Sequence, residues 1–160
     1  MENQLIEIYT DGSCHTQQRI GGWAALIFVN NEKLVLQGSE TDTTHNRMEL
    51  LAVIKSIEYT VKEFNEFEKL FIYTDSQYVE RIPLRTQKFI LQNFRTKSGK
   101  EIQNVDLVKR LIGLLNSTNI EFVKVKAHQK ASDTPNYNRE VDKLSRKIVR
   151  NKINRIHPDT

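Results

Sequence analysis

Cysteine is almost absent from this chain: Cys14 is its only one among 160 residues. A single cysteine excludes an intramolecular disulfide and a zinc site built from several thiolates. No stretch approaches the roughly 18 apolar residues that a membrane-spanning helix needs. The N-terminus, MENQLIEIYT, lacks the basic segment and apolar run of a secretory leader. These absences predict a soluble protein of a reducing compartment, which we expect to be the cytoplasm, with no membrane partner.

Proline and glycine are also scarce, with 3 and 6 residues, and no linker rich in glycine or serine divides the chain. Internal repeats and low-complexity tracts are missing as well. A chain of 160 residues is long enough to bury a sizeable core as one unit. We therefore predict a single domain over residues 1–160, and we expect a freestanding monomer.

Acidic residues are outnumbered by basic ones, 20 against 24, which gives a formal charge of +4 and favours a polyanionic partner only weakly. The segment 85–100 has five basic residues, no acid, and two interleaved phenylalanines. It could bind a polyanion, or it could be a solvated helix face with two core aromatics. A second basic cluster near the C-terminus would provide solubility or loose attraction for phosphates. Its members are Lys143, Arg146, Lys147, Arg150, Lys152 and Arg155.

The first part of the chain predicts strands. Apolar residues alternate with polar ones over 4–10 and 32–40, and an apolar run covers 22–30. The polar segment 11–22 would be the loop after the first strand, and Asn30-Asn31 would be a two-residue turn. Connections this short favour an antiparallel meander.

The later part of the chain alternates helices with strands. Helical spacing of apolar residues predicts helices from Asn46 to Val61, from near Ser76, from Val105 to Leu115 and from about Arg139. Pro83 would limit or interrupt the second of these. Strands at 69–75 and 119–128 each follow a helix, which predicts parallel pairing. The predicted fold class is α/β, with one five-stranded mixed sheet flanked by helices.

Two predicted strands end in nearly the same motif, IYTDGS at 8–13 and IYTDSQ at 72–77. Because these strands would be adjacent and parallel, Asp11 and Asp75 should meet at the carboxyl edge of the sheet. Glu49 and Asp142, each expected in the first turn of a helix, could reach the same place.

Each of these acids also has an ordinary structural explanation. Glu49 suits a capping box with Asn46 as N-cap, Asp142 suits a helix dipole, Asp75 could cap the helix at Ser76, and Asp11 could hold an Asx turn with Gly12. These roles do not explain why four acids should converge. Close carboxylates repel one another and raise each other's pKa values, and a pair of Mg²⁺ ions would remove that cost.

A series of motifs in fixed order resembles type I ribonuclease H over nearly the whole chain. The motifs are DGS at 11–13, GGW at 21–23, THNRMEL at 44–50, TDSQYV at 74–79, NVDL at 104–107, VKAH at 125–128 and NREVD at 138–142. The resemblance implies a ribonuclease H-like fold with strand order 3-2-1-4-5. It also implies an endoribonuclease that cleaves the RNA strand of RNA–DNA hybrids, leaving 5′-phosphate and 3′-hydroxyl ends.

The resemblance also implies roles for the acids. Asp11, Glu49, Asp75 and Asp142 would bind two Mg²⁺ ions, or Mn²⁺ instead, with Asp11 as the bridging ligand. One ion would polarise the attacking water and the other would stabilise the leaving 3′ oxygen. His128 would shuttle a proton or help the product to leave, although by itself it could be a solvated loop histidine.

Substrate contacts are implied at three places. Cys14, Gln17, His45, Asn46 and Gln77 would read 2′-hydroxyls and base edges in the minor groove of the hybrid. Thr44 and Asn104 would hold a phosphate of the DNA strand. A basic protrusion at about 85–103, with Arg85, Lys88, Arg95, Lys97 and Lys100, would grip the duplex. Taken singly, Gln17, His45 and Gln77 could equally be exposed polar surface.

The chain departs from the family pattern near the expected substrate contacts. Asp42 stands where a basic residue is frequent, and Gln17 and His45 stand where asparagines are common. An acid at position 42 should weaken a phosphate contact. These departures affect expected affinity and cleavage preference, and none touches the metal ligands.

Three other functions agree less well with the four acids and the motifs. A catalytically silent hybrid-binding module would gain nothing from negative charge that faces phosphates. A resolvase or transposase-type nuclease of the same fold is disfavoured by Gln77 and THNRMEL. A glycosidase would need one pair of carboxylates and would leave two idle.

Overall fold

The computed structural model describes residues 4–126 and 136–158. Five strands form one sheet in the order β3-β2-β1-β4-β5. β1, β2 and β3 pair antiparallel, whereas β4 pairs parallel with both β1 and β5. The strands are β1 (Leu5–His15), β2 (Ile20–Val29), β3 (Glu32–Glu40), β4 (Lys69–Thr74) and β5 (Ile120–Lys124). The predicted α/β class and strand order are confirmed.

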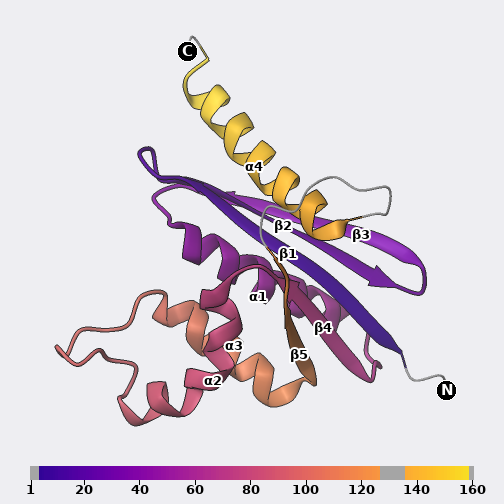
Figure 1. The fold of residues 1–160 in the computed structure, drawn as a ribbon, viewed down its shortest axis with the longest axis vertical. Helices are drawn as coiled ribbons and strands as arrows, with labels where there is room; N and C mark the ends of the chain where they lie inside the picture. The colour runs from indigo at the N-terminus through magenta and orange to yellow at the C-terminus, as the bar shows by residue number, and fades with distance from the viewer. Residues whose placement is uncertain (1–3, 127–135, 159–160) are drawn as a thin grey trace.

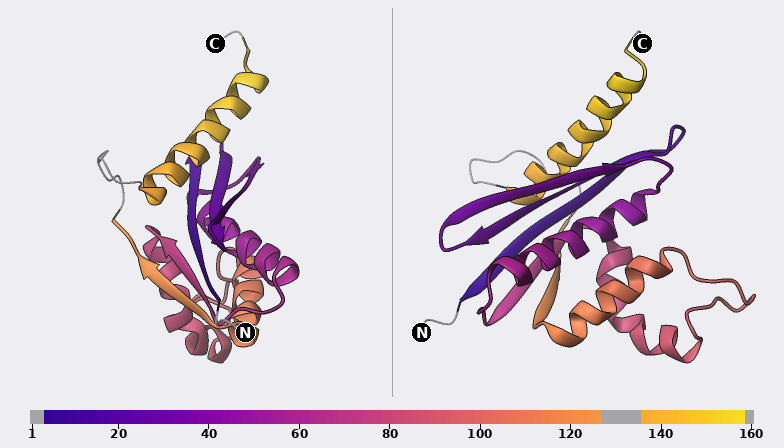
Figure 2. Two further views of the ribbon diagram at one scale, coloured as in Figure 1. Left: turned by 90° about the vertical axis from the view of Figure 1, so that its right-hand side faces the viewer. Right: turned by 180° about the vertical axis from the view of Figure 1, so that it is seen from behind.

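The described residues contain four helices: α1 (His45–Glu63), α2 (Gln77–Leu91), α3 (Val105–Ser117) and α4 (Tyr137–Ile156). α1 and α4 cover opposite faces of β1 and β2 (Figures 1 and 2), and α2 and α3 contact α1. The core lies mainly between the sheet and α1, because Ile6 and Ile8 of β1 share one fully buried cluster with Leu50 and Ile54 of α1. No helix in the described ranges is long and apolar enough to cross a bilayer.

The predicted loop over residues 11–22 is wrong. β1 continues to His15 and β2 begins at Ile20, so that Asp11 pairs with Ala24 and His15 pairs with Ile20. The polar and glycine-containing sequence gives no strand pattern here, because backbone hydrogen bonds to β2, and not apolar side chains, stabilise this extension of β1. Asp11 therefore lies inside a strand and forms no Asx turn.

The helix ends differ from the predictions in small ways. α1 is capped by Thr44 rather than by Asn46, since the Thr44 Oγ1 accepts a 3.2 Å hydrogen bond from the Arg47 N–H. Pro83 lies inside α2 and does not interrupt it, and the buried Ile82 and Phe89 hold the helix on either side of that proline.

At the C-terminal end, α4 begins two residues before the predicted Arg139, with Asn136 as its N-cap. β5 ends at Lys124, earlier than the predicted 128. The last residues of that predicted strand, including His128, lie outside the described part of the chain.

Candidate active site

The two YTD motifs bring their aspartates together. β1 and β4 pair in parallel up to Tyr9 and Tyr73, and Asp11 and Asp75 each follow two residues later. Glu49 reaches the same point from α1. One carboxylate oxygen from each of Asp11, Glu49 and Asp75 lies within 4.8 Å of the others. Three of the four predicted acids therefore form a tight cluster.

Gly12 allows this approach between β1 and α1. A Cβ placed on Gly12 would lie 2.3 Å from the backbone nitrogen of Glu49 and 2.5 Å from the carbonyl carbon of Met48. Backbone atoms cannot retreat as a flexible side chain can, so any larger residue would push the helix away. The glycine after Asp11 thus sets the distance between Asp11 and Glu49.

Asp142 joins the site from the opposite face of the sheet. It lines the same cavity as the three clustered acids but lies outside their tight group. Its Oδ2 accepts a 2.9 Å hydrogen bond from Nη2 of Arg146. α4 can approach because β2 has Gly22 beneath it, where a Cβ would lie 2.9 Å from the carbonyl oxygen of Ser145.

The ordinary structural roles considered for the acids are not the ones observed. Ser76, not Asp75, caps α2, and its Oγ accepts a 3.2 Å hydrogen bond from the Val79 N–H. Glu49 and Asp142 both lie beyond the first turn of their helices, so their predicted first-turn placement is wrong. Capping and helix dipoles therefore do not account for the convergence of these acids.

The carboxylates are held in an environment that opposes their charge. Burial, followed by the charges of Glu49 and Asp75, raises the pKa of Asp11 to about 10. Burial also raises the pKa of Glu49, which is only 1% exposed. Glu49 Oε2 is buried and has no hydrogen-bond partner among the described residues. An unpartnered buried carboxylate oxygen beside two further carboxylates fits a hard divalent cation, whose ligands are oxygens.

His45 is the one cationic partner of the clustered acids seen in the described residues. Its Nε2 lies 3.1 Å from Oε1 of Glu49, one helical turn away. The hydrogen bond to Glu49 raises the pKa of His45. The histidine ring therefore satisfies one oxygen of Glu49 and leaves the other free.

The acids open onto a cavity of about 470 Å³. His45, Asn46 and Gln77, three of the predicted substrate contacts, line it together with the four acids. The sequence interpretation missed other lining residues, namely Ser13, Ser76, Tyr78 and Arg146. Arg146 could have been found because it follows Asp142 by four residues, which places the two side chains next to each other on a helix. Ser145 follows Asp142 by three residues and could have been found in the same way; its hydroxyl donates to Asp11.

Besides the basic residues of the predicted protrusion, four predicted substrate contacts lie outside this cavity: Cys14, Gln17, Thr44 and Asn104. Cys14 lines a neighbouring hollow, and Gln17 is exposed in the turn after β1. Asn104 starts α3 in a left-handed conformation, and its Oδ1 accepts a 3.4 Å hydrogen bond from Arg47. Arg47, which the sequence interpretation also missed, follows Thr44 by three residues and so links both predicted phosphate contacts.

The predicted basic protrusion is the end of α2 and its connection to α3, which extends from the body of the molecule (Figure 1). Phe89 is buried and Phe94 packs against the core, so the two aromatics are structural. None of the five basic residues, Arg85, Lys88, Arg95, Lys97 and Lys100, lines the acidic cavity. Their contact with a duplex stays a prediction.

Comparison with known proteins agrees with this geometry. The family model described as RNase H matches residues 3–150. A ribonuclease H of Caldicellulosiruptor saccharolyticus is 35% identical over 147 residues, which cover 91% of this chain and 96% of that protein. A ribonuclease HI of Xylella fastidiosa (strain Temecula1) is 39% identical over 144 residues, covering 89% and 91%.

A solved structure has the same fold. It is described as LC9-RNase H1, a type 1 RNase H with the type 2 active-site motif, and it superposes with a TM-score of 0.78 at 22% identity, covering 93% of this chain and 74% of that one. The family match spans most of the chain, and the strand order agrees with the motifs that place the acids. The chain belongs to the ribonuclease H family.

Proposed function

We propose that this ribonuclease H cleaves the RNA strand of RNA–DNA hybrids at the cluster of Asp11, Glu49 and Asp75, leaving 5′-phosphate and 3′-hydroxyl ends. The observation that carries the proposal is the buried, unpartnered Oε2 of Glu49 within a group of carboxylates only 4.8 Å across. A binding module would have no use for such a group, because uncompensated acids repel a phosphate backbone.

The four acids suit two Mg²⁺ ions, with Mn²⁺ as the alternative. Asp11, Glu49, Asp75 and Asp142 would hold them, since all four line one cavity with carboxylate oxygens. When bound, such ions supply Lewis-acid activation of the attacking water and stabilisation of the leaving oxygen.

The chain's own residues orient these ligands and the substrate. Ser145 fixes one oxygen of Asp11, and Arg146 fixes one oxygen of Asp142. Asn46 and Gln77 line the mouth of the acidic cavity as neutral donors and acceptors. Such groups suit the 2′-hydroxyls that distinguish an RNA strand from DNA.

Further parts of the proposal rest on the sequence alone. His128 would move a proton or assist product release, and it lies outside the described residues. We also propose that the protein acts as a monomer in the cytoplasm.

One assay tests the activity. Labelled RNA–DNA hybrid, duplex DNA and single-stranded RNA are each incubated with Mg²⁺ and with chelator. We expect the RNA strand of the hybrid to be cleaved when Mg²⁺ is present and not in chelator. Duplex DNA and single-stranded RNA should stay intact in both conditions. Asp11→Asn should abolish turnover while hybrid binding survives, whereas Glu66→Gln, which changes an exposed acid outside the cavity, should leave turnover unchanged. Cleavage of duplex DNA but not hybrid would contradict the proposal, as would an active Asp11→Asn.

A further inference from the structure

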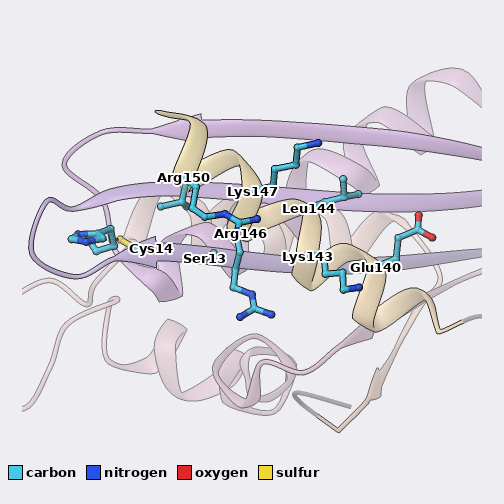
Figure 3. Close-up of a pocket in the computed structure, with 10 residues that line it drawn as sticks. Ser13, Cys14, Glu140, Lys143, Leu144, Arg146, Lys147 and Arg150 are labelled. Carbon is cyan, nitrogen blue, oxygen red and sulfur yellow. Dashed lines mark hydrogen bonds between the residues drawn. The ribbon is translucent and has the colours of Figure 1, made fainter. Parts of the chain in front are cut away.

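A second hollow, of about 740 Å³, lies between the end of β1 and α4 (Figure 3). Ser13 and Cys14 contribute from β1, and basic side chains contribute from successive turns of α4. Ser13 and Arg146 line both this hollow and the acidic cavity. The two hollows are therefore neighbours that share part of their lining, and a strand leaving the acid cluster on this side would pass alongside the basic one.

The basic residues of this hollow form a single stripe on α4. They are Lys143, Arg146, Lys147 and Arg150, at spacings of three and four residues. From Lys143 to Arg150 the stripe covers seven residues, or about 10.5 Å at 1.5 Å per residue. That length matches about three nucleotides of one strand at roughly 3.4 Å of rise each.

Three of the four charges of this stripe are available to a ligand, because in the described part of the chain only Arg146 of the stripe is paired, with Asp142. Lys143, Lys147 and Arg150 are exposed, and none of them makes an ion pair within the described residues. The one acid in the hollow, Glu140, is paired with Lys33 at 2.5 Å. The hollow also has apolar surface from Leu144 and Val149, against which a ribose or base could pack. A merely solubilising helix face would need neither a hollow nor an apolar floor.

We propose that this hollow, the α4 groove, binds the phosphates of the RNA strand where it continues as a single strand beyond the hybrid. The inference rests on the proposed function, since it takes the strand in the groove to be the one that enters the acidic cavity. The groove would favour substrates whose RNA extends past the duplex over blunt hybrids.

Binding in the Asp11→Asn background, which prevents cutting, tests this inference. The probes are a blunt hybrid and the same hybrid with a single-stranded RNA extension at its 5′ or 3′ end. We expect one extended hybrid to bind about tenfold more tightly than the blunt one, and Lys147→Ala with Arg150→Ala to remove that advantage. The slope of log K against log salt should fall by about 1.4, near 0.7 for each lost single-strand phosphate.

The same helix offers a matched control. Lys152→Ala with Arg155→Ala removes the same two charge types at the same spacing from the other side of α4, where these residues line a hollow against β3. This control should keep the advantage of the extended hybrid. The proposal would be wrong if both double variants lost the same part of the binding advantage of the extended hybrid. It would also be wrong if neither RNA extension improved binding to the parent. An advantage that appears only with a DNA extension would overturn its assignment to the RNA strand.

Failure of the groove and failure of the proposed activity have separate readouts. The activity is judged on the blunt hybrid with the unmodified enzyme, and the groove on binding differences between blunt and extended hybrids. A protein that cuts blunt hybrid but shows no extension effect retains the proposed function and loses only the α4 groove.

Discussion

The hydroxyl of Ser145 on α4 donates a 2.7 Å hydrogen bond to Oδ2 of Asp11 on β1. This contact joins the helix on one face of the sheet to the acid cluster that α1 completes from the other face. Ser145 is fully buried, so the bond is shielded from water. A hydrogen bond to a ligand carboxylate fixes its orientation and so supports metal binding.

Ser145→Ala should therefore weaken both metal binding and catalysis. We expect the cleavage rate at limiting Mg²⁺ to fall by about tenfold, with partial recovery at high Mg²⁺, because outer-shell contacts of this kind are typically worth 10–100-fold. Rates measured across a Mg²⁺ titration check this. Ser56→Ala is the matched control, since Ser56 is equally buried but bonds the carbonyl oxygen of Val53 inside α1. A Mg²⁺ dependence that shifts equally in both variants would show that Ser145 has no specific role.

The acid cluster should make the metal-free protein less stable as pH rises. Burial and the charges of Glu49 and Asp75 raise the pKa of Asp11 to about 10, far above its ordinary 3.8. The folded state thus keeps a proton that the unfolded chain releases above pH ~4. The free energy of unfolding in chelator should fall from about pH 4 upward, until the folded state also loses the proton.

Asp11→Asn should flatten that pH profile. In chelator at pH 7.5 we expect this variant to be more stable than the parent by on the order of 2 kcal/mol, since a neutral amide takes up no proton on folding, whereas the Asp11 carboxyl must do so. Near pH 4 the two proteins should have similar stability, and saturating Mg²⁺ should narrow the gap at pH 7.5. Urea denaturation at several pH values measures this. Identical profiles for the two proteins would contradict a raised pKa at Asp11.

The fold and the acid cluster were predictable because each follows from chain-level patterns. Crossover helices dictate parallel pairing of β4 with β1, and the repeated YTD motif then places Asp11 beside Asp75. The extension of β1 to His15 was not predictable, because backbone pairing to β2 rather than an apolar pattern holds it. Ser145 and Arg146 follow Asp142 by three and four residues, and this spacing was a signal for them. The close approach of α4 to β2 at Gly22, which brings them to the site, could not be predicted because Gly22 lies far away in the sequence.

His45 should compete with metal for Glu49. Its Nε2 lies 3.1 Å from Glu49 Oε1, so His45→Ala removes the side chain that pairs with the buried Glu49 carboxylate. We expect a lower melting temperature in chelator and a larger rise on adding Mg²⁺ than in the parent. Thermal denaturation with and without Mg²⁺ checks both. His15→Ala is the control, because His15 lies outside the acidic cavity and its Nδ1 accepts from the Gln18 N–H. An unchanged Mg²⁺ response in His45→Ala would refute the competition.

The connection between α2 and α3 should contribute long-range attraction for the duplex. Lys97 and Lys100 are exposed there and make no ion pair within the described residues. Replacing both with alanine should weaken hybrid binding and reduce the salt slope by about 0.9 for each lost phosphate contact. Lys55→Ala with Lys62→Ala, two exposed lysines on α1, gives a control of equal charge. If the Lys97/Lys100 variant and this control have the same salt slope, the predicted contact between the protrusion and the duplex is wrong.

Gly12 should be the glycine least tolerant of a side chain in the site. Gly12→Ala would set a methyl group 2.3 Å from the Glu49 nitrogen, so α1 must shift away from β1. We expect a loss of about 1–3 kcal/mol in unfolding free energy, as for other overpacked positions, together with weaker Mg²⁺ binding because Glu49 moves away from Asp11.

The control for Gly12→Ala is Gly113→Ala in α3, which meets no atom within 4 Å and should stabilise by about 0.5–1 kcal/mol. Urea denaturation and Mg²⁺ titration of both variants measure the contrast. A Gly12→Ala protein as stable and as responsive to Mg²⁺ as the parent would show that the close contact of β1 with α1 does not set the acid geometry.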